Sequence, residues 1–163
     1  MLRRALLLLT VPAILAVLPA VSVAAPFTAF GPQIGFSQGP DQIVIGGHLQ
    51  WGDVAPQLDF VPGIDLGFGD NVSLVSLNGD FHYRIDTNTQ WQPYVGGGVG
   101  IHFASFDNNG PGQDNSSTDA GGHFIAGADV QTKGRSRFFA EIKLGFGDSP
   151  DFKAMAGWSF KSH

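Results

Sequence analysis

The chain has 163 residues, the length of one ordinary domain, and it contains 23 glycines and no cysteine. Only 14% of its residues are charged, whereas an average soluble domain has about 25%. The lack of cysteine excludes disulfides, thiolate metal sites and cysteine nucleophiles. The net charge of −5 argues against nucleic acid as a partner.

The first 24 residues have the pattern of a secretory signal peptide. Two arginines precede the apolar stretch 5–18, which is followed by small residues including Ser22 and Ala24. The apolar stretch is interrupted by a proline and is shorter than the ~20 residues that a membrane-spanning helix needs. We therefore predict a cleaved signal peptide at 1–24 and one domain at 25–163.

After residue 24 the chain consists of short segments in which apolar and polar residues alternate. A period of two is typical of β-strands that have one face in an apolar environment. Glycine, asparagine, aspartate and proline break the pattern at short intervals, and we place no useful helix in this part of the chain. The predicted strands are 30–37, 42–51, 57–68, 72–85, 90–103, 120–131, 135–146 and 151–161.

The charged side chains of these segments share one phase of the alternation. Glu141 and Lys143, for example, alternate with Ile142 and Leu144. The segment 72–85 follows the pattern least well, because apolar residues at its start fall on the polar phase. The polar phase carries five acids and five bases, namely Asp59, Asp65, Asp80, Asp129, Glu141, Arg84, Arg135, Arg137, Lys143 and Lys153.

Eight antiparallel strands can close into an up-and-down barrel that has no exposed edge. A soluble, lipocalin-like barrel would turn the apolar phase inward around a ligand, whereas a membrane barrel would turn it outward to lipid. The aromatic residues favour the membrane barrel, because they gather near both strand ends, as the two membrane–water interfaces select. One predicted girdle holds Phe30, Trp51, Tyr83, Trp91, Phe138, Trp158 and Phe160, and the other holds Phe36, Phe68, Phe103, Phe124, Phe146 and Phe152.

The one long predicted connection, 104–119, is mostly polar and lies at the end of the barrel opposite to both termini. Outer-membrane barrels keep short turns on the periplasmic side and longer loops outside. We therefore predict that 104–119 faces the exterior, where it is available to an extracellular partner.

Several short motifs within the strands match a known family. They are Gly46-Gly47-His48, Val61-Pro62-Gly63, Asn78-Gly79-Asp80, Tyr83-Arg84, Pro93-Tyr94-Val95-Gly96-Gly97-Gly98, Phe138-Phe139-Ala140-Glu141 and Gly157-Trp158-Ser159-Phe160. With them, the stretch from Phe30 to Lys161 resembles the small eight-stranded outer-membrane β-barrel proteins of Gram-negative bacteria, the porin-like barrel-domain family. The resemblance implies an all-β, eight-stranded antiparallel transmembrane barrel in outer-membrane lipid, placed there by the barrel-insertion machinery. Members usually end in an aromatic residue, whereas Phe160 is followed here by three further residues.

Four histidines fall on the polar phase: His48, His82, His102 and His123. His102 and His123 come from adjacent segments near one mouth of the barrel, so they could approach each other. A metal site needs three or four ligands with supporting partners, and the sequence offers two there. We assign these histidines to polar filling of the lumen, and we expect no metal and no cofactor.

The inward charges are interpreted as a structural network rather than as acid–base machinery, because shielded charges must satisfy one another. We predict in particular that Arg137 pairs with Glu141 or Asp129. The glycine run 96–100 lacks the spacing and the following helix of a nucleotide-binding loop. We expect it to allow close packing of a curved strand.

The sequence thus predicts an integral outer-membrane barrel with a packed polar lumen and a structural or surface-display role, without catalysis and with no catalytic residues. One alternative is a lipid-modifying barrel enzyme, for which the only loose serine–histidine candidate along the chain is His102 with Ser105. The other alternative is a soluble periplasmic binder of an apolar ligand. A general diffusion porin is disfavoured, because eight strands leave no wide aqueous channel.

Overall fold

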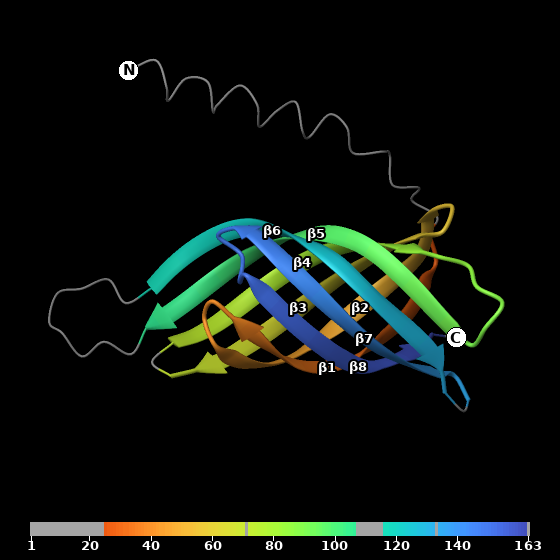
Figure 1. The fold of residues 1–163 in the computed structure, drawn as a ribbon, viewed down its shortest axis with the longest axis horizontal. Coiled ribbons are helices and arrows are strands. Elements are labelled where there is room, and N and C mark those ends of the chain that lie inside the picture. The colour runs from red at the N-terminus through yellow and green to blue at the C-terminus, as the bar shows by residue number, and fades with distance from the viewer. Residues whose placement is uncertain (1–24, 71, 107–115, 133, 163) are drawn as a thin grey trace, which may run out of the picture.

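The protein is a closed barrel of eight antiparallel strands, each paired with its neighbours in sequence, with β8 paired to β1 (Figure 1). The computed structural model describes residues 25–70, 72–106, 116–132 and 134–162. No helix within these ranges is long and apolar enough to cross a membrane. The strands are β1 (Phe27–Gln38), β2 (Gln42–Ala55), β3 (Leu58–Gly69), β4 (Val72–Arg84), β5 (Trp91–Phe106), β6 (Ser116–Gln131), β7 (Ser136–Gly147) and β8 (Phe152–Lys161).

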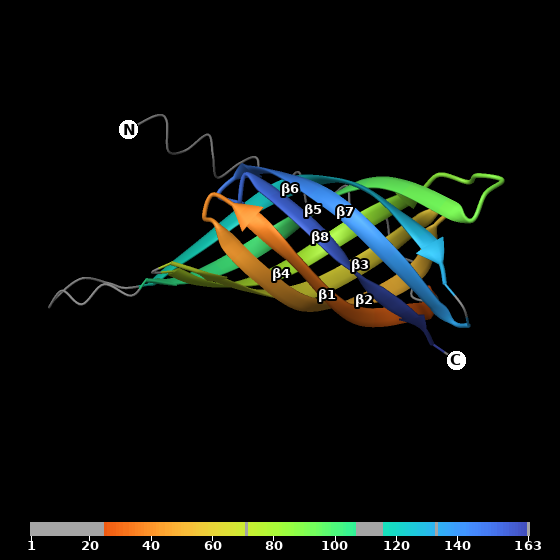
Figure 2. The same ribbon diagram turned by 60° about the horizontal axis from the view of Figure 1, so that its bottom comes forward.

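The strands are tilted to the barrel axis (Figure 2), as closure of a sheet requires. Both ends of the described chain lie at one mouth, together with the turns at 56–57 and 85–90, the end of β6 and the start of β7; we call this the terminal mouth. The opposite mouth, with the turns at 39–41 and 148–150, is the distal mouth. The barrel closes where β1 and β8 meet, from Ala29 opposite Lys161 to Gln38 opposite Phe152.

All eight predicted strands are confirmed, but the predicted connection 104–119 is too long. β5 continues to Phe106 and β6 begins at Ser116, so that Ser105 and Ser116 still pair across the ladder. Serine and threonine are polar enough to resemble a loop in sequence, yet they pair well once the neighbouring strands are in place. The remainder of that connection, 107–115, and the predicted signal peptide lie outside the described residues.

The alternating residues of the strands place apolar side chains on the outside of the barrel and polar side chains inside, the reverse of a soluble protein. On the outside, the side chains of Val99 and Phe124 are 69% and 65% exposed, whereas Asp65, inside the barrel, is only 1% exposed. Large apolar residues cover the exterior from β1 to β8, and the buried set contains acids, lysines and histidines. The prediction that the apolar phase faces outward is therefore confirmed.

The exterior aromatic residues form the two predicted girdles. At the terminal mouth the ring centroids of Phe30 and Phe160 lie 6.3 Å apart, and those of Phe138 and Trp158 lie 5.2 Å apart. At the distal mouth Phe124 and Phe146 form a pair at 5.3 Å. Aliphatic residues such as Val99 occupy the band between the girdles.

The glycine run on β5 lies against neighbouring backbone and lumen side chains, as expected. A Cβ atom on Gly96 would come within 1.9 Å of the carbonyl oxygen of Phe81 on β4. One on Gly98 would come within 2.1 Å of Asp80 Oδ1. These two glycines let β4 and β5 approach closely and leave room inside the barrel for a charged side chain.

Candidate functional site

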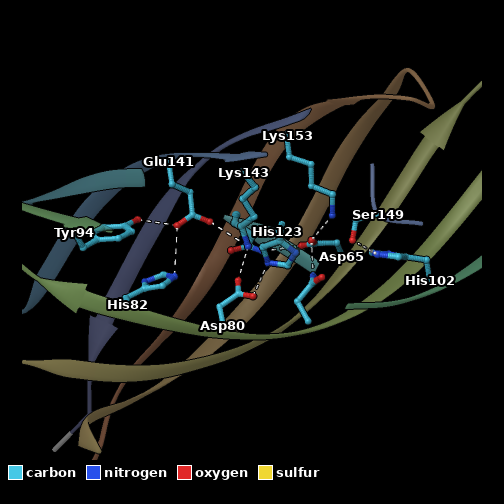
Figure 3. Close-up of polar contacts among 12 residues, drawn as sticks. Asp65, Asp80, His82, Tyr94, His102, His123, Glu141, Lys143, Ser149 and Lys153 are labelled. Atoms are coloured by element: carbon cyan, nitrogen blue, oxygen red, sulfur yellow. Dashed lines mark hydrogen bonds and ion pairs between the residues drawn. The ribbon is translucent and has the colours of Figure 1, made fainter. Parts of the chain in front are cut away.

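The lumen holds a buried network of charged side chains, contributed by strands on all sides of the barrel (Figure 3). At its centre, Lys143 on β7 donates from Nζ to Asp80 Oδ2 on β4 at 2.5 Å. The second oxygen of Asp80 lies 2.8 Å from His123 Nε2 on β6. Lys143 Nζ also lies 3.3 Å from Glu141 Oε1.

Asp65 on β3 is the second centre of this network. It accepts hydrogen bonds from Gln33 Nε2 at 2.6 Å and from Asn78 Nδ2 at 2.8 Å. Lys153 Nζ, on β8, donates to it at 3.0 Å. We call Asp65, Asp80, His123, Lys143 and Lys153, all nearly fully buried, the lysine layer. Its oxygens and nitrogens are densely bonded, which is what makes buried charges tolerable.

A second group lies on the terminal-mouth side of Lys143. The hydroxyl of Tyr94 donates to Glu141 Oε2 at 2.7 Å, and His82 Nε2 lies 3.9 Å from the same oxygen. The ring of His82 stacks on that of Tyr94, with centroids 4.5 Å apart and planes 10° apart. Glu141 therefore connects the lysine layer to the aromatic pair (Figure 3).

Two arginines complete the network at the terminal mouth. Arg84 contacts Asp53 at the rim, and its Nε lies 3.4 Å from Oδ2 of the buried Asp59. Arg137 Nη1 lies 3.4 Å from Asp129 Oδ2. The predicted pairing of Arg137 is confirmed for Asp129, whereas Glu141 has other partners. We call Arg84, Arg137, Asp59 and Asp129 the arginine layer.

The prediction of five acids and five bases in the lumen counts one base too many. The five acids lie inside, but Arg135 lies in the turn before β7 and is exposed. Strand β7 begins one residue later than the alternation indicated. The bases that face the lumen are therefore Arg84, Arg137, Lys143 and Lys153.

The histidines take separate partners. His102 lies 2.8 Å from Ser76 Oγ through Nδ1 and 3.1 Å from Ser149 Oγ through Nε2, whereas His123 faces Asp80. His102 and His123 therefore do not pair with each other, as the sequence had left possible, but bond to separate partners. Among the described residues, no group of three or more histidines and carboxylates is arranged to hold a metal ion.

A second serine–histidine contact joins His48 on β2 to Ser159 on β8, with 2.8 Å between Nε2 and Oγ. These partners are 111 positions apart in sequence, so a search of neighbouring residues could not find them. Within the described chain no carboxylate bonds to the other ring nitrogen of His48, and both nitrogens of His102 face serines. Neither contact forms the serine–histidine–acid arrangement of a hydrolase.

No family model matches the chain, and no curated protein matches it. Among solved structures, Neisserial surface protein A (NspA) superposes with a TM-score of 0.63 at 17% identity, covering 83% of this chain and 94% of its own. A de novo designed transmembrane β-barrel has a TM-score of 0.54 at 17% identity, covering 84% and 97%. The designed barrel TMB2.3 has a TM-score of 0.50 at 15% identity, covering 86% and 98%. The chain thus has the fold of the small eight-stranded outer-membrane β-barrels, as the sequence motifs led us to expect.

Proposed function

We propose that the protein is an integral barrel of the bacterial outer membrane, with a structural or surface-display role and no catalytic activity. The observation that carries the proposal is the inverted polarity of the barrel: an apolar exterior with two aromatic girdles around a charged interior. Lipid is the solvent that selects such an exterior. The partners that follow are outer-membrane lipid and, during biogenesis, the barrel-insertion machinery.

The same observation argues against a soluble barrel that binds an apolar ligand. A lipocalin-like interior would be apolar, whereas this one contains nine charged side chains in the lysine and arginine layers and at Glu141. Membrane fractionation of the expressed protein, with gel mobility compared before and after boiling, tests the proposal. Recovery in the outer membrane with a heat-shifted band supports it, and a soluble periplasmic protein without a shift contradicts it.

We further propose that the distal mouth faces the exterior. Four aspartates surround that mouth, Asp41, Asp70, Asp148 and Asp151, and β5 ends and β6 begins at the same end of the barrel. A surface-displayed barrel would offer this acidic end to extracellular partners. An epitope tag placed in the turn 39–41 should be detected on intact cells, and a tag at 86–89 should require permeabilised cells; the reverse result would invert the orientation.

The lipid-modifying alternative needs a serine and a histidine that lipid can reach. Ser159 and Ser149, which contact His48 and His102, both lie buried inside the barrel. We therefore expect lipid deacylation assays with the purified protein to give no product. Product formation that disappears in Ser159→Ala or Ser149→Ala would replace our proposal with an enzymatic one.

A further inference from the structure

The lumen is not filled evenly. Between the arginine layer and the lysine layer lies a cavity lined by His48, His82, Tyr94 and Val61. Three members of the arginine layer and two of the lysine layer also line it, namely Asp59, Arg84, Asp129, Asp80 and Lys143. The volume in which the centre of a water molecule can lie is about 40 Å³. One water needs roughly 10–15 Å³ by this measure, so the cavity has room for about three.

Polar atoms that make no hydrogen bond within the protein gather around this cavity, although Arg84 Nε and His82 Nε2 each face a carboxylate at 3.4 Å and 3.9 Å. Within the described residues, five buried side-chain atoms lack a hydrogen bond, and His48 Nδ1, His82 Nε2 and Arg84 Nε belong to residues that line the cavity. His48 is only 8% exposed, and its other ring nitrogen is already bonded to Ser159. Buried polar groups are nearly always hydrogen-bonded, to protein or to ordered water.

The two walls of the cavity differ in tightness. Towards the terminal mouth, a hollow of about 740 Å³ shares Arg84 and Asp129 with the cavity, and the ion pairs Arg84 Nε–Asp59 and Arg137–Asp129 are both 3.4 Å long. Towards the distal mouth stands the lysine layer, whose bonds measure 2.5–3.0 Å. The distal hollow, about 190 Å³, shares no described residue with the cavity.

We propose that the lumen is a blind well that binds water. Water enters from the terminal mouth past the arginine layer, bridges His48, His82 and Arg84, and stops at the lysine layer. The site takes molecules the size of water that both donate and accept hydrogen bonds, because the atoms that lack a hydrogen bond belong to imidazoles and a guanidinium. The barrel is thus hydrated from one end and sealed from the other.

Two single-cysteine variants test this directly, since the chain has no cysteine of its own. Val61→Cys places a thiol on the cavity wall, and Val44→Cys places the same group in the lumen away from every described hollow, at 1% exposure. Both folded barrels, checked by heat-shifted mobility, are treated in detergent with methyl methanethiosulfonate. We expect the Val61→Cys thiol to react at least about tenfold faster, because a sealed thiol reacts only when the structure opens.

Equal rates for the two variants, or faster reaction of Val44→Cys, would overturn the proposal. The route by which water enters is tested by adding Arg84→Ala to each cysteine variant. This substitution should speed the reaction of the thiol at position 61 and leave the reaction rate at position 44 unchanged. If Lys153→Met speeds reaction at position 61 and Arg84→Ala does not, the well opens from the distal mouth and our assignment is wrong. A crystal structure with no water within hydrogen-bonding distance of His48 Nδ1 and His82 Nε2 would also contradict it.

Discussion

The lysine layer and the arginine layer solve the same problem in different ways. Both place carboxylates and bases inside a narrow barrel. In the lysine layer Asp80 and Asp65 each have several short contacts and almost no exposure. In the arginine layer Asp59 is also buried and accepts hydrogen bonds from Gln50 Nε2 and Asp53 N at 2.6 and 3.0 Å, but its contact with the guanidinium group is longer. The contact of Asp129 is equally long, and Asp129, Arg137 and Arg84 are 16%, 14% and 24% exposed. The comparison teaches that charges deep in the lumen must be satisfied by protein, whereas charges near a mouth can be shared with water.

The largest effect should come from the centre of the lysine layer. Lys143→Met leaves the carboxylates of Asp80 and Glu141 without their shared base. Breaking a buried ion pair in this way costs about 3–5 kcal/mol, which guanidinium unfolding in detergent micelles would measure. Lys161→Met, at an exposed position on β8, is the control and should be nearly neutral. Similar losses in the two variants would show that Lys143 stabilises the barrel no more than an exposed lysine does.

The next effect concerns the boundary between the charged interior and the apolar exterior. Val99 lies in the aliphatic band of β5. In a lipid bilayer, Val99→Arg should cost roughly 2–4 kcal/mol, whereas Asn88→Arg, in an exposed turn at the terminal mouth, should cost about nothing. Unfolding of both variants in phospholipid vesicles makes the measurement. Equal tolerance would contradict the outward phase.

Two serine variants compare the sealed part of the lumen with the hydrated part. Ser76→Ala removes a hydroxyl 2.8 Å from His102, and Ser159→Ala removes one 2.8 Å from His48 beside the cavity. We expect a loss of about 1–2 kcal/mol for Ser76→Ala and less than about 1 kcal/mol for Ser159→Ala, because water replaces the second hydroxyl. Chemical unfolding of the two variants side by side decides the order, and the opposite order would argue against hydration at His48.

The smallest effect should be the coupling across the arginine layer. A double-mutant cycle of Arg137→Met with Asp129→Asn should give a coupling energy of about 0.5–1 kcal/mol, since the 3.4 Å contact lies near solvent. A cycle of Arg137→Met with Glu141→Gln serves as the control and should give none. Coupling with Glu141 but not with Asp129 would contradict the observed pairing.

The fold could be predicted because its determinants are local. Alternation needs only neighbouring residues, so Ile142 and Leu144 were assigned to the exterior, and Glu141 and Lys143 to the lumen, without any knowledge of distant strands. Arg137 and Asp129 lie on adjacent strands close in sequence, and their pairing was also among the predictions. The extension of β5 to Phe106 was missed, because it depends on pairing rather than on composition.

Contacts across the lumen could not be predicted. Lys143 meets Asp80 from 63 positions away, and His48 meets Ser159 from 111 positions away. Which inward residues meet depends on strand tilt and stagger, which a period of two does not contain. Leu74 gives the same lesson. It is an apolar residue on the polar phase, and it lies in the lumen near the distal mouth because the pairing of β4 with β3 and β5 fixes its register.

The seam between β1 and β8 carries a consequence for how the barrel forms. Ala29 pairs with Lys161, so the last strand to leave the ribosome closes the structure that the first strand began. Contacts so distant in sequence make folding slow. Until the seam forms, both edges carry unpaired amide and carbonyl groups, which lipid cannot satisfy. Truncation before Phe152, which removes the whole of β8, should therefore leave an open sheet in which the edges of β1 and β7 are both unpaired.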